Sequence, residues 1–395
     1  MAFLAGVLTL LLATATILTT RHHHTIPLSS TLSLLILTPL ALADCECGYL
    51  STIGELLPNS HAPSHQQHHA LFTDLIESDF TKLVPEGEGE ATISANTDWV
   101  RQAFNLSDQR ARGKYGEMFA VENVDAAGKE EEDKGLKLVV RGSVVEDMVP
   151  VAEIDTRRLD MYWGTFRASM KMTKERGTCS AFFWYFNDTQ EIDMEFLSKD
   201  FDKSNDSYPV NLVLQSREAV LNGYDSAATS NFVKAYLPFD PTEGFHEYRI
   251  DYLPGRVYFY VDGGLLGKIE GEAVPSSAGH LILQHWSNGN RLWSGGPPGR
   301  DAGLVVRYVK AYFNSSREER QRDWENRCRD PGAEGAVCMV PDVLPTNGTA
   351  GEWFFMERGN MTNNQTVWRS EGGRWEGSTR LSGWVVLGVV VWFML

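Results

Sequence analysis

Positive charge is scarce in this chain of 395 residues. Lys and Arg number 36 against 52 Asp and Glu, which gives a formal net charge of −16 at pH 7. That balance excludes nucleic acids and anionic lipid surfaces as natural partners, because both bind basic faces. A glycine-rich phosphate loop, a zinc-type Cys/His spacing and a Ser/His nucleophile motif are also missing. We therefore expect no cofactor and no catalytic metal, whereas a neutral polymer remains a suitable ligand.

Cysteine is almost as scarce, with five residues in the whole chain. Cys45 and Cys47 precede the main apolar region, and Cys328 and Cys338 follow it. Because the ends of a domain often lie close together, we expect two disulfides among these four in an oxidising compartment, with three connectivities open. Cys179 lies beside an apolar run and is expected to be a buried free thiol.

The most informative motif is acidic. Glu191, Asp193 and Glu195 alternate with apolar residues inside a run of strand composition, residues 181–197. Side chains of a strand alternate between its faces, so the three carboxylates are predicted to share one face. Like charges on one face repel, which disfavours the pattern unless two carboxyl groups act on one bond, as in glycoside hydrolysis. The alternative is a solvated acidic strand face.

Residues 152–155 (Ala-Glu-Ile-Asp) repeat the first half of this pattern. They lack the third acid and run into Arg157 and Arg158. We interpret this second acidic alternation as structural, with its charge neutralised by the neighbouring arginines.

The motif from Glu191 to Phe196 resembles the E-x-D-x-E signature of glycoside hydrolase family 16. Its flanks, Tyr-Trp-Gly-Thr-Phe-Arg-Ala-Ser-Met at 162–170 and the Trp/Gly/Asn-rich segment 285–298, support a similarity that covers most of residues 70–315. The resemblance implies a glycosidase of retaining mechanism. Glu191 would be the nucleophile, Glu195 the general acid/base and Asp193 their assistant.

The spacing of the motif refines the expected activity. Laminarinase-like relatives insert a residue before the last Glu, and this chain does not, which resembles licheninases and glucan transglycosylases. We expect an endo-acting β-glucanase of the licheninase type whose substrate is a cell-wall or plant β-glucan. The alternatives are a cell-wall glucan transglycosylase that uses the same carboxylates, and a non-catalytic, lectin-like carbohydrate-binding module. Structural calcium occurs in some relatives, but no motif here requires it.

Short β-type runs separated by Gly, Pro and Asn/Asp clusters predict an all-β fold with two packed sheets. The resemblance sharpens this to a β-jelly-roll sandwich, concanavalin A-like, whose concave sheet carries the substrate cleft. Pro254-Gly255 and Asp262-Gly263-Gly264 are predicted turns. Phe72 to Leu83 is predicted to form a short helical entry and residues 59–70 a loop. The predicted strands cover 136–141, 148–155, 160–173, 179–186, 190–198, 208–216, 246–253, 256–262, 281–286 and 304–313.

Aromatic residues near the motif are candidates for sugar subsites, because flat rings stack on the apolar faces of sugars. Trp286 and Trp293 lie in a Gly/Asn/Ser/Pro-rich stretch, where core packing explains large rings poorly. Core packing remains the alternative for each ring. The other candidate substrate-binding residues are Tyr162, Trp163, Trp184, Tyr208, Asn211 and His285, the last of which is equally suited to bracing its loop.

Both ends of the chain carry targeting signals. An apolar core at residues 31–42 ends in a small-x-small cleavage pattern at Ala41-Leu42-Ala43. The apolar tail 383–395 follows a polar spacer and small residues, as in a lipid-anchor attachment signal, with a short membrane anchor as the alternative. We therefore expect a secreted monomer held at the outer leaflet of the plasma membrane or in the cell wall.

Seven Asn-x-Ser/Thr sequons agree with a secretory route: Asn105, Asn187, Asn205, Asn314, Asn347, Asn360 and Asn364. The predicted organisation has four parts: a leader at 1–43, a catalytic β-sandwich at 44–316, a disulfide-tied extension and glycosylated stalk at 317–375, and a spacer with a hydrophobic anchor signal at 376–395.

Overall fold

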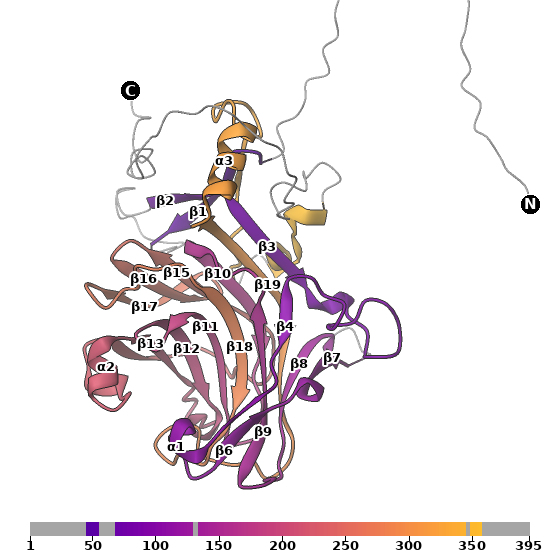
Figure 1. The fold of residues 1–395 in the computed structure, drawn as a ribbon, viewed down its shortest axis with the longest axis vertical. Helices are drawn as coiled ribbons and strands as arrows, with labels where there is room; N and C mark the ends of the chain where they lie inside the picture. The colour runs from indigo at the N-terminus through magenta and orange to yellow at the C-terminus, as the bar shows by residue number, and fades with distance from the viewer. Residues whose placement is uncertain (1–44, 55–67, 129–132, 345–347, 358–395) are drawn as a thin grey trace, which may run out of the picture. The chain divides into compact units, whose positions relative to one another are not determined.

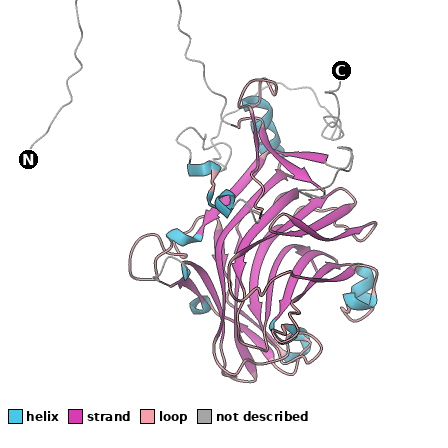
Figure 2. Ribbon diagram, turned by 180° about the vertical axis from the view of Figure 1, so that it is seen from behind, coloured by secondary structure: helices cyan, strands magenta, loops and turns pink. Residues whose placement is uncertain are grey.

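Strands dominate the chain in a computed structural model that describes residues 45–54, 68–128, 133–344 and 348–357 (Figure 1). All of these residues belong to one compact unit. The predicted leader, the predicted anchor signal and the sequons at Asn347, Asn360 and Asn364 lie outside the described residues. Within the described part, the strands form two large sheets and one small one (Figure 2).

The first large sheet carries the acidic motif, and we call its outer surface the groove face. Neighbouring strands are antiparallel except β6 and β9, which run parallel. Across the sheet the order is β14 (Phe232–Tyr236), β13 (Pro209–Gln215), β12 (Gln190–Leu197), β11 (Cys179–Asn187), β18 (His280–Trp286), β9 (Met148–Thr156), β6 (Gly116–Phe119) and β5 (Phe104–Leu106), with β4 (Trp99–Arg101) also paired to β9.

The second large sheet packs against the inner surface of the first, and we call its outer surface the back face. All of its neighbours are antiparallel. Its order is β17 (Gly264–Glu270), β16 (Arg256–Val261), β15 (His246–Leu253), β10 (Met161–Lys171), β19 (Ala302–Ser315), β8 (Gly135–Val140) and β7 (Val124–Ala127), with β3 (Asp74–Asp79) paired to β19.

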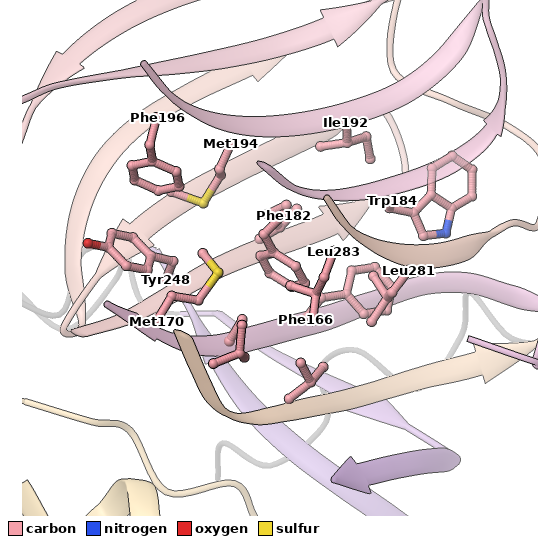
Figure 3. Close-up of a cluster of buried hydrophobic side chains, with 14 of the residues drawn as sticks. Phe166, Met170, Phe182, Trp184, Ile192, Met194, Phe196, Tyr248, Leu281 and Leu283 are labelled. Atoms are coloured by element: carbon pink, nitrogen blue, oxygen red, sulfur yellow. The ribbon is translucent and has the colours of Figure 1, made fainter. Parts of the chain in front are cut away.

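The core fills the space between the two sheets. Ile192 and Met194 of β12 point into it, as do Trp184 of β11, Phe166 of β10 and Leu283 of β18 (Figure 3). Each of these side chains is fully buried, and burying one such side chain stabilises the fold by about 1.5–3 kcal/mol. Because strand residues alternate, this apolar layer forces the acids of β12 onto the groove face. The predicted all-β, two-sheet sandwich of the jelly-roll type is confirmed.

A small sheet and the C-terminal extension cover the back face. The small sheet contains β2 (His68–Phe72), β1 (Gly48–Ile53) and β20 (Val337–Met339), the last parallel to β1. Disulfides join Cys45 to Cys338 and Cys47 to Cys328, and Cys179 is free and buried. The prediction of two disulfides and one buried thiol is therefore confirmed, and the structure selects one of the three connectivities.

Buried charges fasten the extension to the back face. Arg167 and Arg249, both almost fully buried, reach Asp342 at 3.2 and 3.0 Å. Arg167 also donates to the carbonyl of Pro341 at 2.7 Å, and Lys310 donates to the carbonyl of Gly351 at 2.7 Å. Since these partners come from residues 341–351, the first part of the predicted stalk is structurally integrated with the sandwich.

Helices are short and lie between strands. They are α1 (Asp108–Ala111), α2 (Arg217–Leu221) and α3 (Glu318–Arg327), with single 3₁₀ turns at Phe80–Lys82, Val121–Asn123, Ser198–Asp200, Ser226–Ala228, Gly348–Glu352 and Phe355–Glu357. The predicted helical entry from Phe72 to Leu83 is wrong, since β3 and a 3₁₀ turn occupy it. The loop predicted at 59–70 is wrong for residues 68–70, which belong to β2, and its other residues, 59–67, lie outside the described residues.

The predicted strands are all present in the structure, with ends shifted by at most two residues. Both predicted turns are also present, between β15 and β16 and between β16 and β17.

Candidate active site

The three motif carboxylates share the groove face of β12. In the ladder with β13, Glu191, Asp193 and Glu195 stand opposite Gln215, Val213 and Asn211. They line a hollow of about 630 Å³ that extends across the strands from β12 to β6. Asp193 lies between the two glutamates and is 4% exposed, whereas Glu191 and Glu195 are half-buried. The predicted sharing of one face is therefore observed.

Burial and mutual repulsion set the protonation of this trio. Burial raises the pKa of Glu191 to about 7 and raises that of Asp193 well above its usual range. A hydrogen bond between the two side chains lowers the pKa of Glu191 and raises that of Asp193. Asp193 is thus the group of the trio that keeps its proton, and its hydroxyl donates a hydrogen bond to Glu191.

Glu195 is held through one oxygen. Trp293 donates from Nε1 to Oε1 of Glu195 at 3.0 Å, and the Cys179 thiol lies 3.7 Å from the same atom. Burial raises the pKa of Glu195 to about 7, while these two donors lower it. A carboxyl group of this pKa is protonated in a useful fraction near neutral pH, as a general acid needs to be.

A second acidic group faces the same hollow. Glu153 and Asp155 of β9 and Glu117 of β6 all line it. Burial raises the pKa of Glu117 and Asp155 to about 8 and that of Glu153 to about 7. Gln284 hydrogen-bonds Glu153, and Gln102 donates to Asp155 at 2.8 Å.

The expected neutralisation of the acids at residues 152–155 by the neighbouring arginines is therefore wrong. Arg158 pairs with Asp160 at 2.6 Å, and the Arg157 amide donates to the carbonyl of Asp98, so neither is bonded to the acids of β9. The alternation of residues 152–155 already indicated that Glu153 and Asp155 share a face, and Glu117 had no comparable signal in the sequence.

Three predicted sugar-binding residues face the core instead. Trp184 is fully buried and donates from Nε1 to the carbonyl of Met161 at 3.1 Å (Figure 3). His285 is also fully buried, and its ring nitrogens lie 2.9 Å from the carbonyl of Leu138 and 2.9 Å from Oγ1 of Thr178. Tyr208 is 3% exposed and packs in the main core. These three predictions are wrong because the side chains lie on the inner face of their sheet or pack within the core.

The predictions that Tyr162 and Trp163 bind sugar are wrong for a different reason. Both belong to β10, which lies in the second sheet rather than the sheet of the hollow. Their rings stack on each other with centroids 4.2 Å apart and pack against the core. The family-like segment that begins at Tyr162 therefore supports the sandwich and does not contribute to the hollow.

The remaining candidates lie on the groove face or beside it. Trp286 lines the hollow, Trp293 contacts Glu195, and Asn211 stands opposite Glu195 and is almost fully buried. Sequence reasoning missed several lining residues, although the two-residue period of β11 and β18 could have found four of them. The missed residues are Phe183, Tyr185, His280, Gln284, Arg112, Asp188 and Tyr224.

The described residues contain no group of three or more His, Cys, Asp or Glu side chains arranged to hold a metal ion. Over the same residues, no helix has the length and apolar character needed to cross a membrane.

Fold and site together define a two-sheet β-sandwich with a carboxylate-lined groove. Residues 119–305 match the model of the family "Glycosyl hydrolases family 16". This segment of the chain is therefore similar to glycosyl hydrolases of family 16.

Curated relatives match only part of the chain. A β-glucanase of Paenibacillus macerans is 34% identical over 130 residues, which is 32% of this chain and 48% of that protein. "Crh-like protein 2" of Botryotinia fuckeliana (strain B05.10) is 23% identical over 234 residues, 55% of this chain and 46% of that protein. The chain thus spans about half the length of these relatives.

Solved structures are also similar. A prokaryotic β-1,3-1,4-glucanase (lichenase) derived from a mouse hindgut metagenome has a TM-score of 0.45 and 21% identity, and the similarity covers 60% of this chain and 99% of that one. The catalytic domain of an endo-1,3-β-glucanase (laminarinase) from Thermotoga petrophila RKU-1 has a TM-score of 0.46 and 18% identity, covering 62% of this chain and 99% of that one.

Proposed function

We propose that this protein is a retaining glycoside hydrolase that cleaves a β-glucan. The observation that carries the proposal is that Glu191, Asp193 and Glu195 share one face of β12 and line one hollow, with Glu195 bonded to Trp293 through one oxygen. This arrangement gives the two neighbouring glutamates different hydrogen-bond partners, which suits two different roles in one reaction. The β-glucanases among the relatives support the choice of substrate class.

The proposed reaction has two steps. Glu191 attacks the anomeric carbon while Glu195 gives its proton to the departing glycosidic oxygen, so that a covalent glycosyl ester forms and the sugar–oxygen bond breaks. Glu195, now a carboxylate, takes a proton from water, and the water oxygen displaces Glu191 from the anomeric carbon. Asp193 holds the Glu191 carboxylate in position and stabilises its charge through the hydrogen bond between them.

The test uses Glu191→Gln and Glu195→Gln, with Glu272→Gln as the matched control because Glu272 is exposed on a turn. We expect each catalytic variant to lose at least about a thousandfold in the release of reducing ends from mixed-linkage β-glucan, while the control stays within twofold. Azide separates the roles: a glycosyl azide with retained configuration from Glu195→Ala, and with inverted configuration from Glu191→Ala, is expected. Full activity of either Gln variant would refute the proposal.

A second candidate function is transfer of the glycosyl group to a sugar acceptor. The acceptor enters on the side of the acid/base residue, and the indole of Trp293 lies against Glu195 there, close to Phe232 with ring centroids 6.3 Å apart. Aromatic rings at that position favour a sugar over water. Products longer than the starting oligosaccharide would support transfer, and shorter products alone would support hydrolysis.

We also propose secretion and attachment to the outer membrane leaflet or cell wall. Two disulfides support an oxidising route, and the sequons at Asn105 and Asn205 are exposed. The lipid anchor is tested by release of the protein from intact cells with a phosphatidylinositol-specific phospholipase.

A further inference from the structure

Two segments from opposite walls of the groove meet above the motif carboxylates. Arg112 follows α1, and Tyr224 follows α2. The Cζ atom of Arg112 lies 4.2 Å from the centroid of the Tyr224 ring, which is the geometry of a cation–π contact. Both residues line the hollow that contains Glu191 and Glu195.

The backbone of Arg112 is fixed at the Glu195 end of the groove. Asn288 donates from Nδ2 to the carbonyl of Ala111 at 2.6 Å, and Asn290 donates to the carbonyl of Arg112 at 3.2 Å. These asparagines follow β18, whose last residue pairs with Cys179 of β11, which in turn pairs with Leu197 just beyond Glu195. The Asn-rich segment after β18 therefore holds the loop that carries Arg112.

Tyr224 is fixed at the other end. Its hydroxyl donates to Oδ2 of Asp188 at 3.4 Å, and the Tyr185 hydroxyl donates to Oδ1 of the same residue at 2.8 Å. Asp188 belongs to the turn between β11 and β12, beside Glu191. The contact between Arg112 and Tyr224 thus joins a loop anchored near the Glu195 end of the motif to a loop anchored near the Glu191 end.

Backbone strain accompanies this contact. Arg112 and Tyr224 have φ angles of 55° and 67°, in the left-handed region that non-glycine residues rarely adopt. Such conformations persist where the surroundings fix them, and they concentrate at ligand clamps and functional sites. The positive charge of Arg112 also lowers the pKa of both Glu191 and Glu195, as expected of a guanidinium above the two carboxyl groups.

We propose that Arg112 and Tyr224 form a bridge over the catalytic groove that selects chain ends and short oligosaccharides over the interior of a long glucan. The inference depends on the proposed glucanase function, and it replaces the endo-acting mode expected from the sequence with a preference for chain ends. A glucan lies across the strands, because the hollow extends from β12 to β6, so the bridge crosses its path. A free end passes beneath the bridge, whereas an internal segment enters only when the bridge opens.

The experiment compares wild type with Arg112→Ala and Tyr224→Ala, with Glu272→Gln, an exposed residue on a turn outside the hollow, as the control. Two quantities are measured on mixed-linkage β-glucan: the fall in viscosity, which reports internal cleavage, and the release of reducing ends, which reports all cleavage. The ratio of kcat/KM for the polymer to that for an oligosaccharide of the same linkage is measured as well. Both Ala variants are expected to raise this ratio about tenfold and to steepen the viscosity loss per bond cleaved, and Glu272→Gln is expected to stay within threefold of wild type.

An unchanged ratio and unchanged viscosity slope in both Ala variants would overturn the bridge. That outcome differs from failure of the glucanase function itself, in which wild type would release no reducing ends from either substrate. Binding provides a readout that needs no turnover. In a Glu191→Gln background, Arg112→Ala is expected to strengthen binding of the polymer in affinity electrophoresis and to leave oligosaccharide binding within threefold; equal effects on both ligands would also overturn the proposal.

Discussion

Glu195 owes its orientation to two donors on one oxygen, and one of them is a thiol. In the ladder between β11 and β12, Cys179 stands opposite Leu197. Leu197 is two residues after Glu195, so the side chains of Cys179 and Glu195 lie on the same face of the sheet. Burial raises the pKa of the Cys179 thiol well above its usual range, so the sulfur stays protonated and donates. The thiol therefore acts on the acid/base residue and not as a nucleophile.

Replacing Cys179 by Val removes that donor and is expected to raise the pKa of Glu195. Because Glu195 acts in its protonated form, the alkaline limb of the kcat/KM profile moves to higher pH, by about 0.4 unit for a weak hydrogen bond of about 0.5 kcal/mol. The limb of the wild type is expected near pH 7, where the pKa of Glu195 lies. Cys179→Ser keeps a donor and is the matched control; identical alkaline limbs in wild type and Cys179→Val would show that the thiol only fills space.

At the residue scale, the sequence predicted well that the motif carboxylates share one face, and it predicted poorly which aromatic side chains reach the groove. The acids followed from alternation within one strand, which needs no knowledge of the neighbouring strands. Trp286 and His285 were both predicted to bind sugar, although adjacent residues of a strand point to opposite faces and only one of them reaches the groove. Tyr162 and Trp163 could not be excluded in this way, because their location in the second sheet depends on the pairing of β10 with β15 and β19.

At the scale of elements, long strands with one apolar face were predicted almost to the residue, and short or exposed ones were not. β14 and β17 are edge strands with exposed residues, so their composition lacks the buried pattern that identified the others. β3 was mistaken for a helix because its polar residues are buried together with its apolar ones, so its sequence lacks the two-residue alternation that identifies a strand. The docking of residues 341–342 on the back face depends on charged side chains from distant strands, which no local pattern records.

Asp342 is the main acidic partner in that docking. Its replacement by Ala leaves Arg167 and Arg249 buried with one carboxylate fewer, which is expected to cost about 2–4 kcal/mol in the free energy of unfolding. Asp342→Asn keeps an acceptor oxygen and is expected to lose less. Urea unfolding measures both, and hydrolytic activity below the transition should remain, since the site lies on the opposite face; equal stability of wild type and Asp342→Ala would show that the extension is held by other contacts.

For the molecule as a whole, the buried acids make stability depend on pH. Glu117, Glu153 and Asp155 keep their protons up to about pH 7–8 in the folded state, whereas in the unfolded chain they lose them near pH 4. Between these values the folded state binds more protons than the unfolded state, so the free energy of unfolding falls as pH rises from about 5 to 8.

Glu117→Gln removes one of these groups. The drop in the free energy of unfolding between pH 5 and pH 8 is expected to be smaller in this variant by roughly 1–3 kcal/mol, since one pKa unit corresponds to about 1.4 kcal/mol. Urea unfolding at pH 5 and pH 8 measures the difference for wild type and variant. The exposed Glu272→Gln is expected to keep the slope of wild type. A wild-type protein that is equally stable at both pH values would contradict the raised pKa values of the groove.

The two disulfides have a consequence for how the groove is presented. They tie residues 45 and 47 to the segment 328–338 beside the back face, and Phe355 packs there against Tyr49 and Tyr312. The first and last described residues therefore leave the sandwich from the side opposite the carboxylates. Attachment through either end would therefore leave the groove face unobstructed, on the side accessible to a large polymer.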